Sequence, residues 1–525
     1  MPISRRVAEH ARNRPDALAV AIGSERIAFG RLARRAAQVA AGLSALPLPA
    51  TPCCPGVPAD GRLLAVAVGN DPRFPELFVG GTAGAHACAV LDPKWAPAQA
   101  ASILPRLRPD LLIVGDAVAP AQPALLSAAR EHGIPILTAE SYEAWLAQYE
   151  GTDPDRHLAP PREGETFLVG FTSGTTSLPK AFHRTRASWR ASLVAGRGVF
   201  ALDPSTRMLA PGPLAHGLTL YALAEALDIG AAFHGLPAFD GEAAAATIRN
   251  EDIRRLVVVP TMLAALCDAA RSTGEVFPAV RSIVTAGAKL DASLAEQTQA
   301  VLPNAGIIEY YGASELSFVT VAEREPGGAV GDDVGRPFPG VEIAIRDAAG
   351  RPTEDGMPGT VFVRGPLLSN GYLWGAEDGS GFRTDGAGWA TVGDIGWLDE
   401  AGALHLAGRE GEMVITGGLN VYPAEVEQAL LRSLPGVERA VVLGMPDDYL
   451  GRRLVAILSG PGVAGLTQRR AAELCLPHLP RYKIPRQLFA VAAAGWPMTG
   501  SGKIARKEIA KWIADGHDRL VALPP

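Results

Sequence analysis

The chain is 525 residues long, with 48% hydrophobic and 20% charged residues and a formal net charge of −6 at pH 7. This length exceeds what one ordinary core needs, so we expect two or more domains. The composition excludes a largely disordered protein. The acidic balance, with no basic stripe, argues against nucleic acid as a main partner. No apolar run is long enough for a membrane span and no signal core is present, which favours a cytoplasmic protein.

The cysteines are few and scattered: Cys53, Cys54, Cys88, Cys267 and Cys475. No pair has the spacing of metal ligands, and their number is odd. We therefore expect reduced thiols rather than disulfides.

The first part of the chain alternates strands with helices. Residues 5–46 have helical periodicity, interrupted near residues 23–26 by an expected hairpin of two short strands, and residues 47–61 are a proline-rich loop. Strands are then expected at 63–68, 88–91, 111–114 and 135–137, with helices at 72–83, 97–107 and 120–132. This alternation predicts a mostly parallel sheet with helices on its faces.

The pattern repeats beyond residue 165 and changes after residue 328. Strands are expected at 166–170, 207–209, 231–235, 256–259, 282–286 and 306–309, with helices at 181–199, 219–228, 242–250, 261–270 and 292–301. Short β runs between 328 and 407, separated by glycine-rich turns, indicate a small β-barrel. The fold class is therefore α/β, with a large N-terminal domain, residues 1–408, and a smaller α+β C-terminal domain, residues 409–525.

A hydroxyl-rich stretch follows the strand expected at 166–170. Residues 171–180 read Phe-Thr-Ser-Gly-Thr-Thr-Ser-Leu-Pro-Lys and form an expected strand-to-helix loop. Hydroxyls and free backbone N–H groups hold phosphate oxygens, and a lysine neutralises their charge. The spacing is not that of a Walker loop, and a serine- and threonine-rich surface turn is the alternative. The residues predicted to cradle phosphate are Thr172, Ser173, Gly174, Thr175, Thr176 and Lys180.

This stretch resembles the phosphate loop of the adenylate-forming enzymes, a superfamily of acyl-CoA synthetases, peptide-synthetase adenylation domains and luciferases. Six further stretches match that superfamily in the expected order. The resemblance extends over residues 60–507 and is weakest before residue 165. The resemblance implies a two-domain enzyme that activates a carboxylic acid with ATP and whose smaller C-terminal domain is mobile.

The resemblance assigns residues 310–315, Tyr-Tyr-Gly-Ala-Ser-Glu, to the nucleotide site. It implies that Tyr311 stacks on adenine, that Ser314 contacts phosphate and that Glu315 holds Mg²⁺. Tyr310 and Gly312 complete this segment. Mg²⁺ needs one or two protein carboxylates plus phosphate oxygens, which a lone glutamate provides. From the residues alone, a turn closed by a carboxylate is the alternative.

Three further segments belong to the implied nucleotide site and hinge. Gly287 and Ala288 follow a strand and would let adenine lie flat against the backbone. Asp394 would accept hydrogen bonds from both ribose hydroxyls, and Arg409 would contact ribose and phosphate. Glu412 stands at the position of the family's hinge residue.

The C-terminal part carries two glycine-rich segments. By resemblance, the turn that begins at residue 416 swings in after adenylation and lines the pantetheine tunnel with Gly417, Gly418 and Leu419. Glycines suit close approach of the backbone to a thiol arm. Lys503 occupies the position of the family's catalytic lysine, which bridges the substrate carboxylate and the α-phosphate. From the residues alone, an exposed solubilising charge is the alternative.

Residues 211–216 resemble the segment that lines the acyl pocket, so His216 is a predicted catalytic and pocket residue. Amino-acid-activating domains carry an aspartate in this neighbourhood. Residues 214–218, Leu-Ala-His-Gly-Leu, contain none, which favours an acid without an α-amino group. A structural histidine is the alternative. The further candidate pocket walls are Leu218, Tyr221, Thr261, Ala286, Leu316 and Phe318.

The prediction is an AMP-forming carboxylate–CoA ligase that uses ATP, Mg²⁺ and CoA and releases AMP and pyrophosphate. One alternative loads the acyl group onto the phosphopantetheine of a carrier protein. A luciferase-like oxidase and a non-catalytic nucleotide-binding protein are further alternatives. The sequence does not identify the acid or its chain length, and it does not decide whether the protein forms a homodimer.

Overall fold

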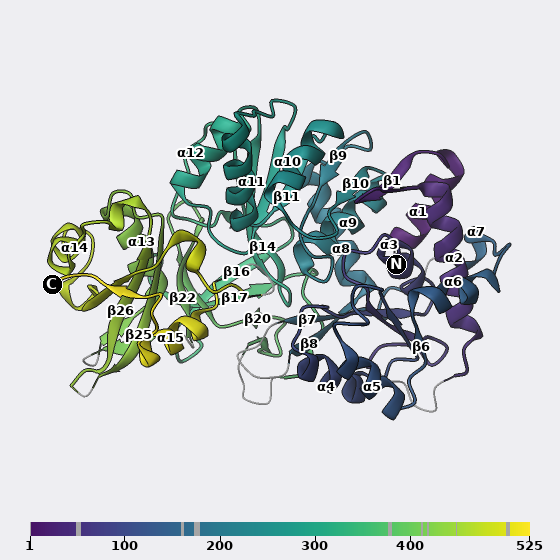
Figure 1. Ribbon diagram of the computed structural model, residues 1–525. Coiled ribbons are helices and arrows are strands. Elements are labelled where there is room, and N and C mark those ends of the chain that lie inside the picture. The colour runs from purple at the N-terminus through teal and green to yellow at the C-terminus, as the bar shows by residue number, and fades with distance from the viewer. Residues whose placement is uncertain are drawn as a thin grey trace. The chain divides into compact units, whose positions relative to one another are not determined.

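The computed structural model describes residues 2–48, 54–158, 162–172, 179–375, 381–410, 413–416, 419–447, 449–499 and 504–525. The chain forms two compact units (Figure 1). The first comprises residues 1–331, 335–342 and 363–392, and the second comprises 332–334, 343–362 and 393–525. The predicted domain boundary between residues 408 and 409 marks a hinge. Because the two units are defined by their compactness, they do not test this boundary, and it stays a prediction.

The first unit contains a nine-stranded sheet in the order β15-β14-β13-β12-β11-β9-β10-β1-β2. Its inner pairs, from β1 through β10, β9, β11 and β12 to β13, are parallel, whereas β1–β2, β13–β14 and β14–β15 are antiparallel. The strands are β1 (Leu18–Ile22), β2 (Glu25–Ala28), β9 (Arg207–Leu209), β10 (Ala232–Gly235), β11 (Arg255–Val258), β12 (Ser282–Ala286), β13 (Gly306–Ala313), β14 (Ser317–Arg324) and β15 (Arg336–Pro337).

Helices cover both faces of this sheet. Figure 1 shows α10 (Gly241–Asn250), α11 (Pro260–Thr273) and α12 (Ala292–Val301) side by side. Their apolar residues form one core cluster with Leu256 and Ile283 of the sheet. Because strand side chains alternate between faces, Val257 and Val284 point the other way, toward α9 (Gly217–Ile229).

A seven-stranded sheet, in the order β18-β8-β7-β4-β3-β5-β6, forms the other half of the first unit. Helices α4 (Pro97–Leu107) and α5 (Pro123–Glu131) share a core cluster with it and lie beside each other in Figure 1. The alternation expected over 63–137 is confirmed. The strands are β3 (Leu63–Ala67), β4 (Ala87–Val90), β5 (Leu111–Val114), β6 (Ile136–Leu137), β7 (Thr166–Thr172), β8 (Lys180–Thr185) and β18 (Tyr372–Trp374).

The helix expected over 181–199 is wrong at its start. Residues 180–185 form strand β8, which pairs antiparallel with β7, and helix α8 extends over Arg186–Phe200. The helix begins there because Thr185 caps it, accepting a hydrogen bond from the N–H of Ser188 at 3.3 Å. The hydroxyl-rich loop therefore joins two neighbouring strands rather than a strand and a helix.

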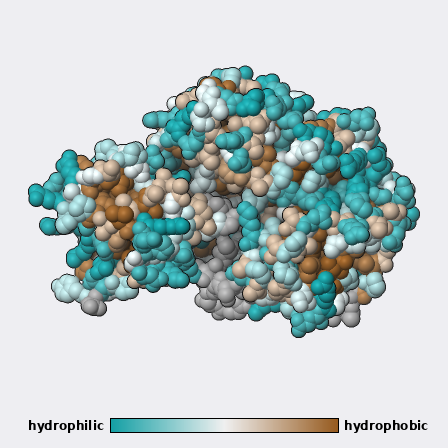
Figure 2. Space-filling model, in the orientation of Figure 1, coloured by the Kyte–Doolittle hydropathy of each residue, from teal (hydrophilic) through white to brown (hydrophobic). Residues whose placement is uncertain are grey.

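The remaining helices of the first unit are α1 (Pro2–Asn13), α2 (Phe29–Ala45), α3 (Phe74–Gly81), α6 (Ala139–Ala147) and α7 (Pro154–His157). Figure 2 shows hydrophilic side chains over most of the visible face of this unit, broken by hydrophobic patches. Within the described ranges, no helix is both long and apolar enough to cross a membrane.

Where a small β-barrel is expected, the structure has a six-stranded sheet in the order β19-β20-β17-β21-β22, with β16 beside β17. Its strands are β16 (Glu342–Arg346), β17 (Gly359–Arg364), β19 (Arg383–Thr384), β20 (Ala390–Thr391), β21 (Asp394–Leu398) and β22 (Leu404–Arg409). Strand β17 contributes residues to both compact units.

The rest of the second unit is the expected α+β arrangement. A short hairpin precedes a four-stranded sheet in the order β25-β26-β27-β28. The elements are β23 (Val414–Thr416), β24 (Leu419–Val421), α13 (Pro423–Ser433), β25 (Arg439–Asp447), β26 (Gly451–Ser459), α14 (Gln468–Cys475), β27 (Gln487–Ala490), α15 (Arg506–Asp515) and β28 (Val521–Ala522).

The expectation of free thiols holds for the cysteines within the described residues. Cys54, Cys88, Cys267 and Cys475 are free and buried. Burial raises the pKa of the Cys267 thiol to about 11, so that thiol stays protonated at neutral pH. Cys53 lies outside the described residues.

Candidate active site

Strands β7 and β8 fix both ends of the hydroxyl-rich loop. Thr172 and Lys180 lie opposite each other in the register of the two strands, so the loop leaves and re-enters the sheet at one place. Several predicted site residues lie outside the described residues: Ser173, Gly174, Thr175, Thr176, Glu412, Gly417, Gly418 and Lys503. Their roles stay predictions.

Glu315 lies at the base of this loop, in the turn between β13 and β14. Its side chain is buried, and its Oε1 atom accepts hydrogen bonds from the hydroxyl of Tyr372 at 2.6 Å and from the hydroxyl of Thr172 at 3.3 Å. Burial and the charge of Glu315 raise the pKa of Tyr372, so this phenol stays protonated and donates. Residues from β7, β18 and the β13–β14 turn thus meet at one carboxylate.

Lys180 is buried beside the same cluster. Its Nζ atom lies 5.4 Å from the centroid of the Tyr372 ring. The backbone at Gly381 passes so close that an added Cβ would lie 2.7 Å from the Tyr372 hydroxyl and 3.2 Å from Lys180 Nζ. Gly381 also has a φ of 89°, which favours glycine. The loop base therefore combines an acidic and a basic side chain within tight backbone packing.

The residues present fit a single magnesium-binding carboxylate. The Oε2 atom of Glu315 has no hydrogen bond to any described residue. The described ranges also contain no group of three or more His, Cys, Asp or Glu side chains that could hold a metal. A cation at Glu315 would therefore take its other ligands from nucleotide phosphates and water.

The two tyrosines of residues 310–315 lie on opposite faces of β13, because strand side chains alternate. Both side chains are half-buried, and the Tyr310 ring lies 4.8 Å from that of Phe318. Gly312 is required by close packing, since an added Cβ would lie 2.1 Å from the Ser317 carbonyl oxygen. Gly287, which follows the parallel strand β12, has a φ of 92°. Tyr311 as the adenine-stacking residue stays a prediction.

His216 stands at the N-cap of α9, and the structure gives it an acidic partner. Its Nε2 atom lies 3.0 Å from Oδ2 of Asp92, which follows β4. Burial alone would raise the pKa of Asp92, but the hydrogen bonds from His216 and from the N–H of Lys94 outweigh it and lower this pKa. Asn70 fixes the same loop by accepting from the Leu214 N–H and donating to the Gly212 carbonyl.

Asp92→Asn is expected to destabilise the fold at pH 7 by about 1 kcal/mol. Because folding lowers the pKa of Asp92, its ionised form stabilises the native state above the unfolded value of about 4, and this stabilisation is lost as the pH falls through the native value. The difference from wild type should therefore shrink toward pH 3. Urea unfolding at both pH values measures it, with the exposed Asp268→Asn as control. An equal difference at both pH values would contradict an ionised partner for His216.

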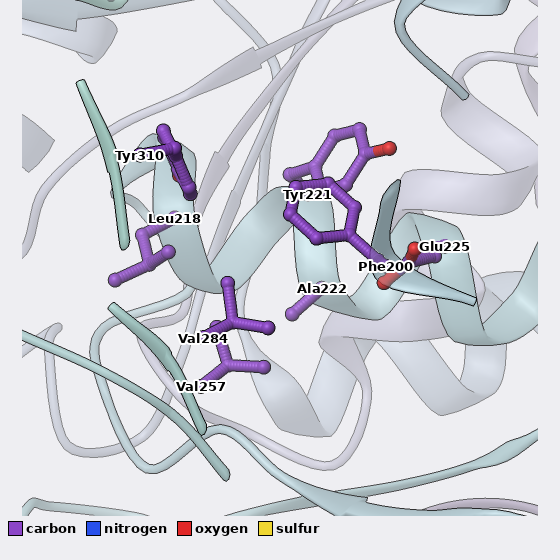
Figure 3. A pocket seen from close by; sticks show the side chains of 8 residues that line it. All are labelled: Phe200, Leu218, Tyr221, Ala222, Glu225, Val257, Val284 and Tyr310. Atoms are coloured by element: carbon purple, nitrogen blue, oxygen red, sulfur yellow. The ribbon is translucent and has the colours of Figure 1, made fainter. Parts of the chain in front are cut away.

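A small pocket lies between α9 and the sheet (Figure 3). Of the predicted acyl-pocket residues, Leu218 and Tyr221 line it, and Tyr310 from the predicted nucleotide segment lines it too. Phe318 packs against it, with its ring 4.8 Å from those of Tyr221 and Tyr310. The other lining residues are Phe200, Ala222, Glu225, Val257 and Val284.

The remaining predicted pocket residues surround this region without lining the pocket. Thr261 is in the first turn of α11, and Ala286 ends β12, where it lies opposite Tyr310. Leu316 is buried in the β13–β14 turn. His216 lies two residues before Leu218, at the start of the helix that forms one pocket wall.

Within the second unit, Asp394 begins β21 and Arg409 ends β22. These residues are paired in the register, and Arg409 Nε donates to Asp394 Oδ1 at 2.7 Å. The Asp394 side chain is buried, whereas that of Arg409 is 55% exposed. Leu419 is 46% exposed in β24. The ribose and tunnel roles of these residues stay predictions.

Comparison with known proteins identifies the family. The model of the AMP-binding enzymes matches residues 7–373, and that of the AMP-binding enzyme C-terminal domain matches residues 425–503. The chain belongs to the AMP-binding enzyme family. The predicted membership of the adenylate-forming superfamily, and the predicted class of AMP-forming carboxylate–CoA ligase, are confirmed.

Relatives match this AMP-binding enzyme over nearly its whole length. The uncharacterized acyl–CoA ligase YhfT of Bacillus subtilis is 32% identical over 516 residues, which cover 98% of this chain and 99% of YhfT. The fatty acid–[acyl-carrier-protein] ligase ScoC of Streptomyces coeruleorubidus is 28% identical over 512 residues, 95% of this chain and 94% of ScoC. The crystal structure of ATP-bound MatB from Rhodopseudomonas palustris aligns with a TM-score of 0.82 at 21% identity, covering 98% of this chain and all of MatB, which shows the fold.

Sequence reasoning missed three residues of this AMP-binding enzyme's candidate site. Asp92 comes directly after the strand expected at 88–91, a position that could have marked it. Tyr372 gave no usable signal, because its partner Glu315 is 57 residues away. Glu225 is seven positions after Leu218, on the same face of a predicted helix, which the helical period could have revealed.

Proposed function

We propose that the protein joins a carboxylic acid lacking an α-amino group to CoA through an acyl-adenylate. The observation that carries this proposal is Glu315, held by Thr172 and Tyr372 at the base of the hydroxyl-rich loop. Because Mg²⁺ prefers carboxylate ligands and hydroxyl-rich loops suit phosphate, this arrangement supports the binding of ATP with its metal.

In the first step, a carboxylate oxygen of the acid forms a bond to the α-phosphorus of ATP, and pyrophosphate leaves. Negative charge gathers around that phosphorus, so Lys180 at the loop and Lys503 from the C-terminal segment are assigned to offset it. Mg²⁺ at Glu315 would neutralise phosphate charge. In the second step, the sulfur of CoA bonds to the acyl carbon, the bond to AMP breaks, and the thiol proton goes to solvent.

The acid class is inferred from the start of α9. The carboxylate of Asp92 lies near the predicted acyl pocket, but one oxygen contacts His216 and the other accepts from the Lys94 N–H. Because both oxygens of this carboxylate already have partners within the protein, it is not left open for the ammonium group of an amino acid. This supports a substrate acid without an α-amino group.

Exchange of labelled pyrophosphate into ATP, screened over short, medium, aryl and dicarboxylic acids and over amino acids, tests the first step. Exchange with a non-amino acid is the expected result, and exchange with amino acids alone would refute the acid class. No exchange with any acid would refute the activity.

A carrier protein is the second candidate acceptor, because the ScoC match covers 95% of this chain. Parallel assays with free CoA and with phosphopantetheine-loaded carrier proteins separate the two. Thioester formation on a carrier with none on CoA would overturn the proposal.

A further inference from the structure

The pocket beside α9 is built from one face of a helix. Its lining residues Leu218, Tyr221, Ala222 and Glu225 have the spacing i, i+3, i+4, i+7, which aligns side chains along one stripe. The opposite wall comes from β11, β12 and β13, near the carboxyl ends of parallel strands, where ligands of α/β folds bind. From Leu218 to Glu225 the stripe extends about 10 Å along the helix.

Glu225 is the one acidic residue of that lining. Its side chain is 95% buried, since its relative exposure is 5%. Its Oε1 atom has no hydrogen-bond partner among the described residues. Figure 3 shows it beside Phe200 at one side of the pocket, with Leu218 and Tyr310 at the other side.

The charged neighbours do not satisfy this carboxyl. Arg255 is the cation that acts on Glu225, but its Nη2 atom donates to the Phe200 carbonyl, and its Nε and Nη1 atoms have no hydrogen-bond partner among the described residues. Asp228 adds a second negative charge, itself paired with Arg197. The tyrosines Tyr221 and Tyr310 are uncharged, because burial raises the pKa of both phenols.

A buried acceptor without a donor is unfavourable, and a leucine would fill the same position of an apolar stripe without that penalty. The described residues supply no hydrogen-bond donor to this oxygen. Burial raises the pKa of Glu225 to about 7, against the opposing charge of Arg255, so near neutral pH it can accept from an ammonium or exchange hydrogen bonds with a hydroxyl.

We propose that Glu225 recognises a hydrogen-bond donor at the far end of the acyl substrate, so that the substrate is an acid carrying a terminal hydroxyl or amino group. This proposal rests on the proposed function and names the substrate class of the same site. An unsubstituted alkyl end would leave Oε1 unpaired, and a terminal carboxylate would meet a like charge once Glu225 ionises.

Pyrophosphate exchange with matched acids tests the assignment. At each chain length, the plain acid is compared with the ω-hydroxy, ω-amino and dicarboxylic acids, for the full-length enzyme. The wild type is expected to favour the ω-hydroxy or the ω-amino acid about 10- to 100-fold in kcat/KM over the plain acid. Whichever of these two acids has the higher kcat/KM identifies the hydrogen-bond donor.

Two variants separate recognition from stability. Glu225→Gln keeps the shape and an acceptor, so it should retain a hydroxyl preference but lose an amino preference. Glu225→Leu should show no preference for the ω-hydroxy or the ω-amino acid and should be more active than the wild type with plain acids. Glu242→Gln, at an exposed position in α10, is the matched control and should change nothing. Thermal melting confirms that each variant is folded.

The outcomes distinguish this inference from the proposed function. If the wild type favours plain or dicarboxylic acids, or if Glu225→Leu leaves the ratio of rates unchanged, the inference is wrong while acid activation stands. If no acid of any class supports exchange, the proposed function itself fails.

Discussion

Replacement of Lys503 by alanine is expected to slow acyl-adenylate formation about 100- to 1,000-fold. The reaction of a supplied acyl-adenylate with CoA should stay near the wild-type rate. The physical reason is that negative charge builds at the α-phosphate in the first step, whereas the second step expels AMP from a carbonyl carbon. Pyrophosphate exchange measures the first step, and thioester formation from synthetic adenylate measures the second.

Lys507→Ala is the matched control, because Lys507 is an exposed lysine only four positions further along, in α15. It should leave both half-reactions unchanged. An equal loss of both half-reactions in the Lys503 variant would refute the division of labour between the two steps.

Glu315→Gln is expected to lower the adenylation rate on the order of 100-fold and to raise the Mg²⁺ concentration required for half-maximal rate. The amide keeps the shape of the side chain and can still accept from Tyr372 and Thr172, but it lacks the charge that a hard cation needs. Rates measured over a Mg²⁺ titration at fixed ATP test this.

Tyr372→Phe should give a milder defect of about 10-fold, because it removes a hydrogen bond that orients Glu315 and leaves the charge in place. Glu323→Gln, at an exposed position of β14, is the control for loss of a carboxylate in the same hairpin. If the Glu315 variant kept the wild-type Mg²⁺ dependence, its role as the metal ligand would be wrong.

Local pattern was sufficient for most of the fold. Apolar runs that alternate with segments of helical period predict the parallel sheets, because the spacing of apolar residues in each segment indicates which of its faces is buried. The prediction was wrong at residues 180–185: alanine suits a helix, but phenylalanine suits a strand, and antiparallel pairing with β7 makes this segment a strand. Thr185, a good N-cap residue, carried the signal for where the helix begins.

The candidate site was only partly predictable, because its contacts join distant residues. His216 was recognisable from its neighbours in sequence, but Asp92, its partner, is 124 positions away. Glu315 was recognisable in the same way, whereas no local feature links it to Tyr372. Spatial pairing of this kind is a property of the folded sheets, which a single sequence does not display.

The burial of the described cysteines makes the chain suited to fluorescent labelling. A maleimide needs an accessible thiolate, and Cys54, Cys88, Cys267 and Cys475 are all buried. With Cys53 changed to serine, cysteines introduced for Val194, 57% exposed in α8 of the first unit, and for Leu476, 51% exposed after α14 of the second, offer two sites for dyes. Resonance energy transfer between the dyes, recorded as ATP, acid and CoA are added in turn, would then report directly whether the C-terminal part rotates between the half-reactions.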